Sequence, residues 1–150
     1  MRDKLFDQYF PPEGRLCTNE EETRSAGKDL CGALGRGPAL ISLEGPLGAG
    51  KTCFVKGLAM AFGINPENVS SPTFSLVHEY TKGNRALAHL DLYRLDSPGE
   101  LEALGLEDIL AEHDITAIEW GDKFLSSLPP ATIRLVFSLE DDARRIRLLR

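Results

Sequence analysis

Residues 45–52, Gly-Pro-Leu-Gly-Ala-Gly-Lys-Thr, constrain this chain more than any other part of its sequence. They fit the pattern Gly-x-x-x-x-Gly-Lys-Ser/Thr, and they lie between a short apolar run, residues 39–43, and a helical pattern that begins at Lys51. A buried strand that enters a glycine-rich turn and leaves it as a helix is typical of phosphate-binding P-loops. The sequence therefore predicts a P-loop with a nucleoside triphosphate as its ligand.

The positions of the loop have distinct chemical tasks. Gly45, Gly48 and Gly50 permit backbone angles that a Cβ would oppose, so successive N–H groups can turn inward to bind an anion. Lys51 is expected to contact the β- and γ-phosphates of ATP, and Thr52 to offer its hydroxyl to Mg²⁺. The predicted nucleotide-binding residues of this segment are Gly45, Pro46, Leu47, Gly48, Ala49, Gly50, Lys51, Thr52 and Cys53.

Two further apolar runs end in a carboxylate. Residues 87–90 lead into Asp91, and residues 115–118 lead into Glu119. Ligands of α/β sheets gather at the carboxyl ends of strands, so both groups are candidates to hold Mg²⁺ or to position the attacking water. The pattern does not rank the two, and a carboxylate at a sheet end without such a role is the alternative for each.

Three side chains near these elements have two interpretations each. Thr73, in the Ser-Pro-Thr segment 71–73, is a candidate sensor of the γ-phosphate, although this segment is also an ordinary turn. His89 shares a strand face with Asp91, but it is interpreted as structural, because the three histidines have no metal-ligand spacing. Trp120 follows Glu119 and either lines the site or packs; we favour the site.

The N-terminal part predicts an irregular segment followed by a helix. Residues 1–14 are expected to form a flexible lead-in, because Pro11, Pro12 and Gly14 interrupt regular structure. Thr18 and Glu21 have the spacing of a capping box, which opens a helix that reaches about residue 35.

The order of strands predicts an α/β domain over residues 15–150. Residues 74–80 and 86–92 predict one hairpin, and residues 132–139 and 145–149 predict a second. Together with the strand, loop and helix around residue 45, they indicate a P-loop NTPase-like mixed sheet with flanking helices and antiparallel strand additions.

Composition limits the partners and the compartment. A net charge of −6 does not fit a protein that wraps nucleic acid by itself, since such proteins have a broad basic face. No stretch approaches the roughly 20 apolar residues of a membrane-spanning helix, and the N-terminus has no apolar signal core. We therefore expect a cytoplasmic protein that contacts RNA through partners and has no membrane association.

The three cysteines fit a reducing compartment, since their number is odd and they form no Cys-x-x-Cys pair. Cys17 and Cys31 are interpreted as packing residues. Cys53 is the exception, because it lies in the first turn of the helix after the loop, where the helix dipole can lower a thiol pKa.

Four motifs follow the loop in a fixed order. They are residues 71–80, with Ser-Pro-Thr-Phe, Leu-Val and Glu-Tyr; residues 89–95, His-Leu-Asp-Leu-Tyr-Arg-Leu; residues 100–106, Glu-Leu-Glu-Ala-Leu-Gly-Leu; and residues 118–120, Ile-Glu-Trp. Over about residues 18–148, the chain closely resembles the bacterial TsaE family, also called YjeE.

The resemblance implies a cytoplasmic ATPase of tRNA threonylcarbamoyladenosine biosynthesis, which works with the TsaB–TsaD pair and resets that complex between turnovers. By position it implies that Lys51 binds phosphate and that Thr52 and Glu119 serve as ligands of Mg²⁺. It also implies that Asp91 holds the Walker B position and that Thr73 lies in a switch-like segment. Arg144 is implied to be close to the nucleotide. Pro46 and Cys53 depart from the residues expected in the family, but neither change removes a phosphate or metal ligand.

Other functions compete with Mg-dependent ATP hydrolysis. A nucleotide-gated adaptor without significant hydrolysis is one alternative, and its product would be a protein contact. A small-molecule kinase would need an acceptor pocket and an arginine-bearing lid, and the sequence has no lid-like insertion. A GTPase would have Asn-Lys-x-Asp, which residues 120–123 do not match. Arg94 is the candidate for an arginine finger within the chain; without one, slow turnover alone is expected.

Overall fold

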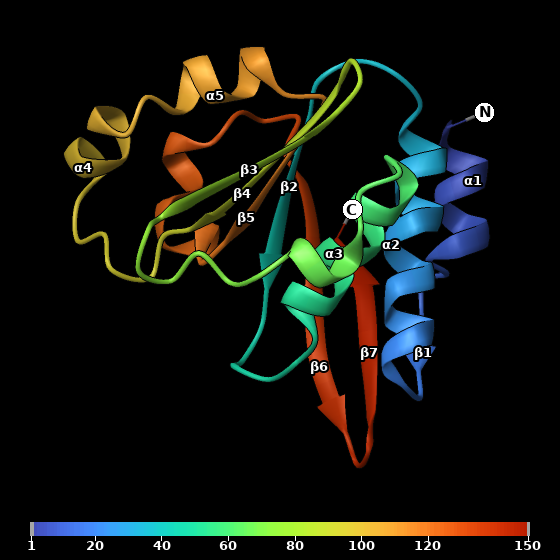
Figure 1. Ribbon diagram of the computed structural model, residues 1–150. Coiled ribbons are helices and arrows are strands. Elements are labelled where there is room, and N and C mark those ends of the chain that lie inside the picture. Colours follow the sequence, from blue (N-terminus) through green and yellow to red (C-terminus); the bar gives the residue numbers. More distant parts are fainter. Residues whose placement is uncertain (1, 150) are drawn as a thin grey trace.

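The computed structural model describes residues 2–149 as one mixed sheet with helices on both faces (Figure 1). The strands are β1 (Arg15–Cys17), β2 (Ala39–Glu44), β3 (Val77–Lys82), β4 (Arg85–Asp91), β5 (Ile115–Glu119), β6 (Ile133–Glu140) and β7 (Ala143–Leu148). The helices are α1 (Arg2–Tyr9), α2 (Glu20–Leu34), α3 (Lys51–Ala61), α4 (Pro98–Ala103) and α5 (Leu106–Glu112), with the 3-10 helices η1 (Pro66–Asn68) and η2 (Gly121–Ser127). None of the helices within residues 2–149 has the length and apolar character to cross a membrane.

The sheet has a parallel centre and antiparallel edges. Its strand order is β1-β7-β6-β2-β5-β4-β3. The neighbours β6, β2, β5 and β4 are parallel. At one edge β3 pairs antiparallel with β4, and at the other β7 pairs antiparallel with both β6 and β1. The predicted P-loop NTPase-like sheet with antiparallel additions is confirmed. Because parallel strands end at the same edge, the carboxyl ends of β2, β4 and β5 lie together.

The sheet separates two apolar clusters. On one face, Phe54 and Leu58 of α3 belong to the same buried cluster as Leu43 of β2, together with residues of α1 and α2. On the other face, α4, α5 and η2 contribute to a cluster that includes Leu90 of β4 and Ile118 of β5. The central strands are therefore covered on both faces, which explains their nearly continuous apolar runs.

Helices α2 and α3 approach each other closely through two glycines. A Cβ at Gly57 would lie 2.0 Å from the carbonyl oxygen of Arg24, and a Cβ at Gly27 would lie 2.3 Å from that of Phe54. No larger side chain fits either position without a backbone shift. This packing fixes α3, and with it the first-turn residue Lys51, against the rest of the fold.

The N-terminal segment differs from the predicted irregular lead-in over residues 1–14. Residues Arg2–Tyr9 form α1, which ends before Pro11 and Pro12. Phe6 and Phe10, four residues apart, are 9% and 0% exposed in the core cluster. The prediction was wrong here because it rested on the helix breakers and gave no weight to this apolar pair.

The start of α2 lies one residue later than the predicted capping box. Asn19 is the N-cap and accepts a hydrogen bond from the Glu22 N–H at 2.8 Å, while the Glu22 carboxylate accepts one from the Thr18 N–H at 2.7 Å. The hydrogen bonds from Thr18 lower the pKa of Glu22. Thr18 and Asn19 can both cap a helix and three glutamates follow, so spacing alone selected the wrong pair.

Both predicted hairpins are present, but the first begins later than expected. Residue 74 was expected to start a strand, whereas β3 starts at Val77. The preceding residues form a turn in which the Leu76 N–H donates to the Pro72 carbonyl at 2.8 Å and Leu76 has a φ of 69°. Phe74 is consequently 86% exposed and does not join the sheet.

Candidate nucleotide-binding site

The glycine loop connects the end of β2 to the start of α3. Gly45, Gly48 and Gly50 have φ values of 145°, 81° and 97°, which side chains with a Cβ rarely adopt. Gly45 is also confined, because a Cβ there would lie 2.4 Å from the Phe137 carbonyl oxygen. The structure thus gives each predicted loop glycine a backbone conformation that favours glycine.

An ion pair fixes the strand residue that precedes the loop. Arg134 of β6 donates from Nε and Nη2 to the two carboxylate oxygens of Glu44, at 2.7 and 2.8 Å. Ser42 Oγ donates to the same carboxylate at 3.2 Å. The hydrogen bonds to Glu44 raise the pKa of Arg134 above its ordinary value. This two-pronged contact holds the point at which the chain leaves the sheet.

Lys51 turns back over the loop from the first turn of α3. Its side chain is 5% exposed, and Nζ donates to the Gly45 carbonyl oxygen at 2.7 Å. Nζ also lies 3.9 Å from Glu119 Oε1 and 4.9 Å from the centroid of the Trp120 ring. A lysine held over a glycine loop at a helix N-terminus is the arrangement by which P-loop proteins contact the outer phosphates.

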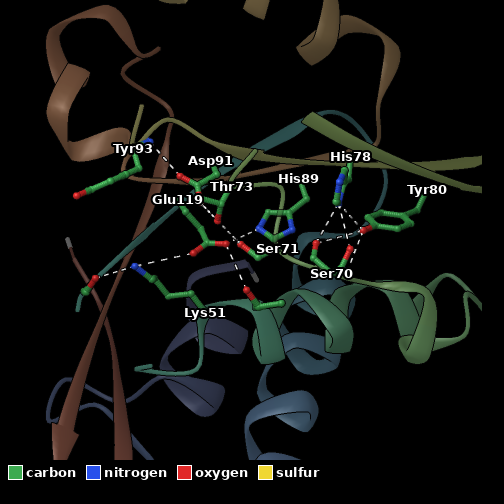
Figure 2. A network of polar contacts seen from close by, with 12 residues as sticks. Lys51, Ser70, Ser71, Thr73, His78, Tyr80, His89, Asp91, Tyr93 and Glu119 are labelled. Carbon is green, nitrogen blue, oxygen red and sulfur yellow. Dashed lines mark hydrogen bonds and ion pairs between the residues drawn. The ribbon is translucent and has the colours of Figure 1, made fainter. Parts of the chain in front are cut away.

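Glu119 faces the loop from the end of β5. It is 5% exposed, and its Oε2 lies 3.5 Å from Thr52 Oγ. The same oxygen lies 2.6 Å from His89 Nε2, and Figure 2 shows this contact. With Lys51 beside Oε1, three different side chains surround this carboxylate.

Asp91 faces a different segment, although it is the register partner of Glu119 on β4. Its Oδ2 accepts from Thr73 Oγ at 3.1 Å, and its Oδ1 accepts from the Tyr93 N–H at 2.9 Å. Thr73 Oγ in turn lies 2.9 Å from Ser71 Oγ (Figure 2). The two carboxylates, which the sequence pattern does not rank, therefore have different neighbours.

The oxygens of Thr52 and Glu119 are suited to a hard divalent cation. Mg²⁺ in nucleotide sites is typically bound by one or two protein oxygens together with phosphates and water. Within residues 2–149, no group of three or more His, Cys, Asp and Glu side chains is placed to hold a metal ion. The two oxygens of Thr52 and Glu119 fit a cation whose remaining ligands come from phosphate and water.

A cavity of about 800 Å³ opens over these side chains. All four predicted catalytic residues line it, namely Lys51, Thr73, Asp91 and Glu119. Thr52, Cys53, Pro46, Leu47, Gly48 and Gly50 line it as well, whereas Gly45, Ala49 and Arg144 do not.

Arg144 lies on the other side of the loop, beside the β6–β7 turn. Its Nε donates to the Gly48 carbonyl oxygen at 3.1 Å, and it lines a second cavity of about 200 Å³ with residues at the start of α2. Gly48, Gly50 and Cys53 border both cavities. The loop thus separates the large cavity, which contains Lys51, Asp91 and Glu119, from a small one that contains Arg144 together with Glu20 and Asp142.

The environment of Cys53 contradicts the expected low thiol pKa. Burial is the largest influence and raises the pKa of Cys53, and the nearby Glu20 carboxylate acts in the same direction. Burial also raises the pKa values of Cys17 and Cys31, which both lie in the core cluster. All three thiols are free, and the packing role predicted for Cys17 and Cys31 is confirmed.

Sequence reasoning missed one residue of the site, Tyr93, and underrated another, His89. His89, interpreted as structural, contacts Glu119; the shared strand face with Asp91 was visible in the sequence, but the register with β5 was not. Tyr93 lines the large cavity, and its ring centroid lies 5.1 Å from that of Trp120. Trp120 lines the cavity as favoured, with a φ of 63° that is rare for a bulky residue. No sequence signal identified Tyr93.

Comparisons with known proteins point to one family. A profile of the family described as "Threonylcarbamoyl adenosine biosynthesis protein TsaE" matches residues 17–146. The chain is 42% identical to the tRNA threonylcarbamoyladenosine biosynthesis protein TsaE of Haemophilus influenzae, over 73% of this chain and 69% of that protein. It is 37% identical to the protein of the same name from Aquifex aeolicus, over 90% and 94%. The crystal structure of YdiB from Bacillus subtilis is similar, with a TM-score of 0.70 and 31% identity over 89% of this chain and 82% of that one. The chain belongs to the TsaE family.

Proposed function

We propose that the chain is a cytoplasmic, Mg-dependent ATPase of tRNA threonylcarbamoyladenosine biosynthesis. The observation that carries this proposal is the meeting of Lys51, Thr52 and Glu119 at the end of a glycine loop, with Thr52 Oγ 3.5 Å and Lys51 Nζ 3.9 Å from the Glu119 carboxylate. One basic group for phosphate and two oxygens for a cation are what a metal-bound triphosphate requires. The names of the relatives supply the biological process.

The two cavities suggest how the nucleotide lies. The outer phosphates belong on the side of Lys51 and Glu119, because the cation ligands lie there. A triphosphate that crosses the loop then brings its nucleoside toward the smaller cavity, where Arg144 contacts Gly48. In this orientation Arg144 is close to the nucleotide, as the family resemblance implies.

Hydrolysis in this site depends mainly on charge stabilisation. A bound Mg²⁺ would neutralise charge on the phosphate oxygens. Lys51 and the loop N–H groups stabilise the charge that spreads over the transferred phosphoryl group. Asp91, through its hydrogen bond from Thr73, holds residues 71–73 at the outer-phosphate end, where this pair can orient the attacking water.

Turnover of the isolated chain should be slow. Lys51 is the only basic residue among the described residues that line the large cavity. Arg94, the candidate for an arginine finger, has its guanidinium 5.6 Å from the centroid of the exposed Phe74 ring. An arginine supplied by a partner is worth about 10³- to 10⁵-fold in rate in related enzymes. We infer that the TsaB–TsaD pair accelerates hydrolysis.

A nucleotide-gated adaptor is a second candidate, favoured by the exposure of two apolar side chains near the site. Leu47 in the loop is 90% exposed, and Phe74 beside Thr73 is 86% exposed. Side chains of this kind are suited to a protein contact that depends on the bound nucleotide.

Phosphate release from Mg-ATP, measured with and without purified TsaB and TsaD, tests the proposal. We expect slow, Mg-dependent release by the chain alone and faster release with the pair, both lost in Lys51→Ala. Retained ATP without release in either condition would support the adaptor and contradict the ATPase. Fast release that the pair does not change would contradict the dependence on partners.

A further inference from the structure

His89 is a buried side chain in contact with the site, and the proposed reaction assigns it no task. It is 0% exposed, and it lies on β4 two residues before Asp91, so both side chains are on the same face of the sheet. Its Nε2 lies 2.6 Å from Glu119 Oε2. The two contacts of Glu119 with the loop helix are longer, at 3.5 Å to Thr52 and 3.9 Å to Lys51. The histidine is therefore the closest polar neighbour of this carboxylate among the described residues.

The geometry determines which nitrogen of His89 carries a hydrogen toward the carboxylate. Nδ1 is buried and has no hydrogen-bond partner among the described residues. A hydrogen on Nδ1 alone would leave a buried donor unpaired and would place two lone pairs 2.6 Å apart at Nε2 and Oε2. A hydrogen on Nε2 avoids the second cost and gives a short, charge-assisted hydrogen bond. His89 is thus a donor to Glu119.

The neighbouring histidine does not share this task. His78 is the cross-strand partner of His89 on β3. Its Nδ1 lies 3.1 Å from the Ser70 carbonyl oxygen and 3.2 Å from Tyr80 Oη, away from Glu119 (Figure 2). Among the described residues of β4, His89 is the one whose side chain contacts the carboxylate.

The position of Glu119 needs such a restraint because a competing partner is close. The Lys51 ammonium is 3.9 Å from Oε1, near enough to draw a free carboxylate into a direct ion pair. A closer ion pair would neutralise part of the Lys51 charge that is intended for phosphate and would move Oε1 from its present position. A donor on the far side of Glu119 opposes this movement.

We propose that His89 is a positioning residue: its Nε2–H holds the Glu119 carboxylate beside Thr52, in the place where a divalent cation that accompanies the nucleotide would be bound. This inference rests on the proposed function. Partners that orient a metal ligand in this manner typically contribute about 10- to 100-fold to metal affinity.

Two polar substitutions distinguish positioning from packing. His89→Gln can place an amide N–H where Nε2 lies, whereas His89→Asn can place one only near Nδ1. The measurement is Mn²⁺ affinity by electron paramagnetic resonance, with the non-hydrolysable ATP analogue saturating, and Glu119→Gln serves as the reference for loss of the ligand. We expect His89→Asn to weaken Mn²⁺ binding about 10- to 100-fold and His89→Gln to restore most of the affinity. Affinity for the analogue without metal should stay close to that of the wild type in both variants.

The outcomes separate this inference from the proposed function. If the wild type retains no analogue, the proposed function fails. If the wild type binds analogue and Mn²⁺, and Glu119→Gln weakens Mn²⁺ binding but His89→Asn does not, the inference alone is overturned. If the Gln and Asn variants lose the same amount of Mn²⁺ affinity and their melting temperatures fall equally, His89 has a structural role. This outcome also overturns the inference.

A measurement on the wild type avoids variants that fail to fold. Nitrogen-15 NMR of the imidazole in the metal-free chain should show a hydrogen on Nε2 of His89 and none on Nδ1. A hydrogen on Nδ1 with none on Nε2 would overturn the inference.

Discussion

Two neighbouring strand ends of this protein carry carboxylates in contrasting surroundings. At the end of β5, Glu119 lies between His89 of β4 and the first-turn residues Thr52 and Lys51 of α3. At the end of β4, Asp91 is bonded to Thr73 and to the backbone of Tyr93. Both carboxylates are buried and in register, so the difference arises from the side chains that each one meets.

The contrast shows that the Glu119 end of the site is held by helix packing, whereas the Asp91 end is connected with the surface. The surroundings of Glu119 depend on α3, which the glycine contacts with α2 hold in place. The surroundings of Asp91 depend on a turn that carries the exposed Phe74. We therefore assign cation binding to the fixed end and sensing of the outer phosphate to the end connected with the surface.

The largest effect should come from Glu119→Gln. The substitution keeps the shape but removes the charge beside Thr52, so Mg-dependent phosphate release should fall about 100- to 1,000-fold. ATP affinity measured without metal should stay close to that of the wild type. Glu112→Gln, an exposed position on α5, is the control. A normal rate in Glu119→Gln would remove the distinction between the two strand ends.

Asp91→Asn should have a smaller effect. It weakens the acceptor for Thr73 but leaves Thr52 and Glu119 in place, so the rate should fall about 10- to 100-fold with Mn²⁺ affinity retained. Thr73→Val removes the donor of the same hydrogen bond, and combining it with Asp91→Asn should add little further loss. Loss of Mn²⁺ binding in Asp91→Asn would reverse the assignment of the two carboxylates.

Gly57→Ala tests how far the fixed end depends on helix packing. The added Cβ would meet the Arg24 carbonyl oxygen at 2.0 Å, so stability should fall by about 1 to 3 kcal/mol, or about 2 to 12 °C in melting temperature. Gly32→Ala in α2 is the matched control, since nothing lies within 4 Å of its added Cβ. A Gly57→Ala variant as stable as the wild type would show that α3 is not fixed by this contact.

The smallest effect concerns Cys53, which borders both cavities. Its pKa is raised above the ordinary 9.0, so the folded thiol should ionise at higher pH than a free thiol. Its rate of alkylation should therefore begin to increase at a higher pH than that of a free thiol. The unfolded chain ionises first, so the contribution of this thiol to stability is complete below 9.0 and is lost at higher pH. Alkylation followed by mass spectrometry against pH measures the shift. A profile shifted to lower pH would indicate a stronger positive potential at the start of α3.

Local patterns predicted much of the fold and the loop, but not the arrangement of distant residues. The glycine loop, the parallel sheet and the positions of Asp91 and Glu119 at strand ends follow from short-range spacing. The pairing of Glu119 with His89 depends on the register of two strands about 30 residues apart, which spacing does not encode. The α1 helix is stabilised by burial of Phe10, a tertiary effect that outweighed the nearby prolines.

Calorimetric titration with the ATP analogue and Mg²⁺ tests most directly that the loop binds a nucleotide. The wild type should bind, and Lys51→Ala should bind about 100-fold or more weakly, because it loses a charged phosphate contact. Lys56→Ala, also on α3 but not lining either cavity, should bind as the wild type does. Equal binding by Lys51→Ala and the wild type, or no binding by the wild type at millimolar analogue, would contradict the account.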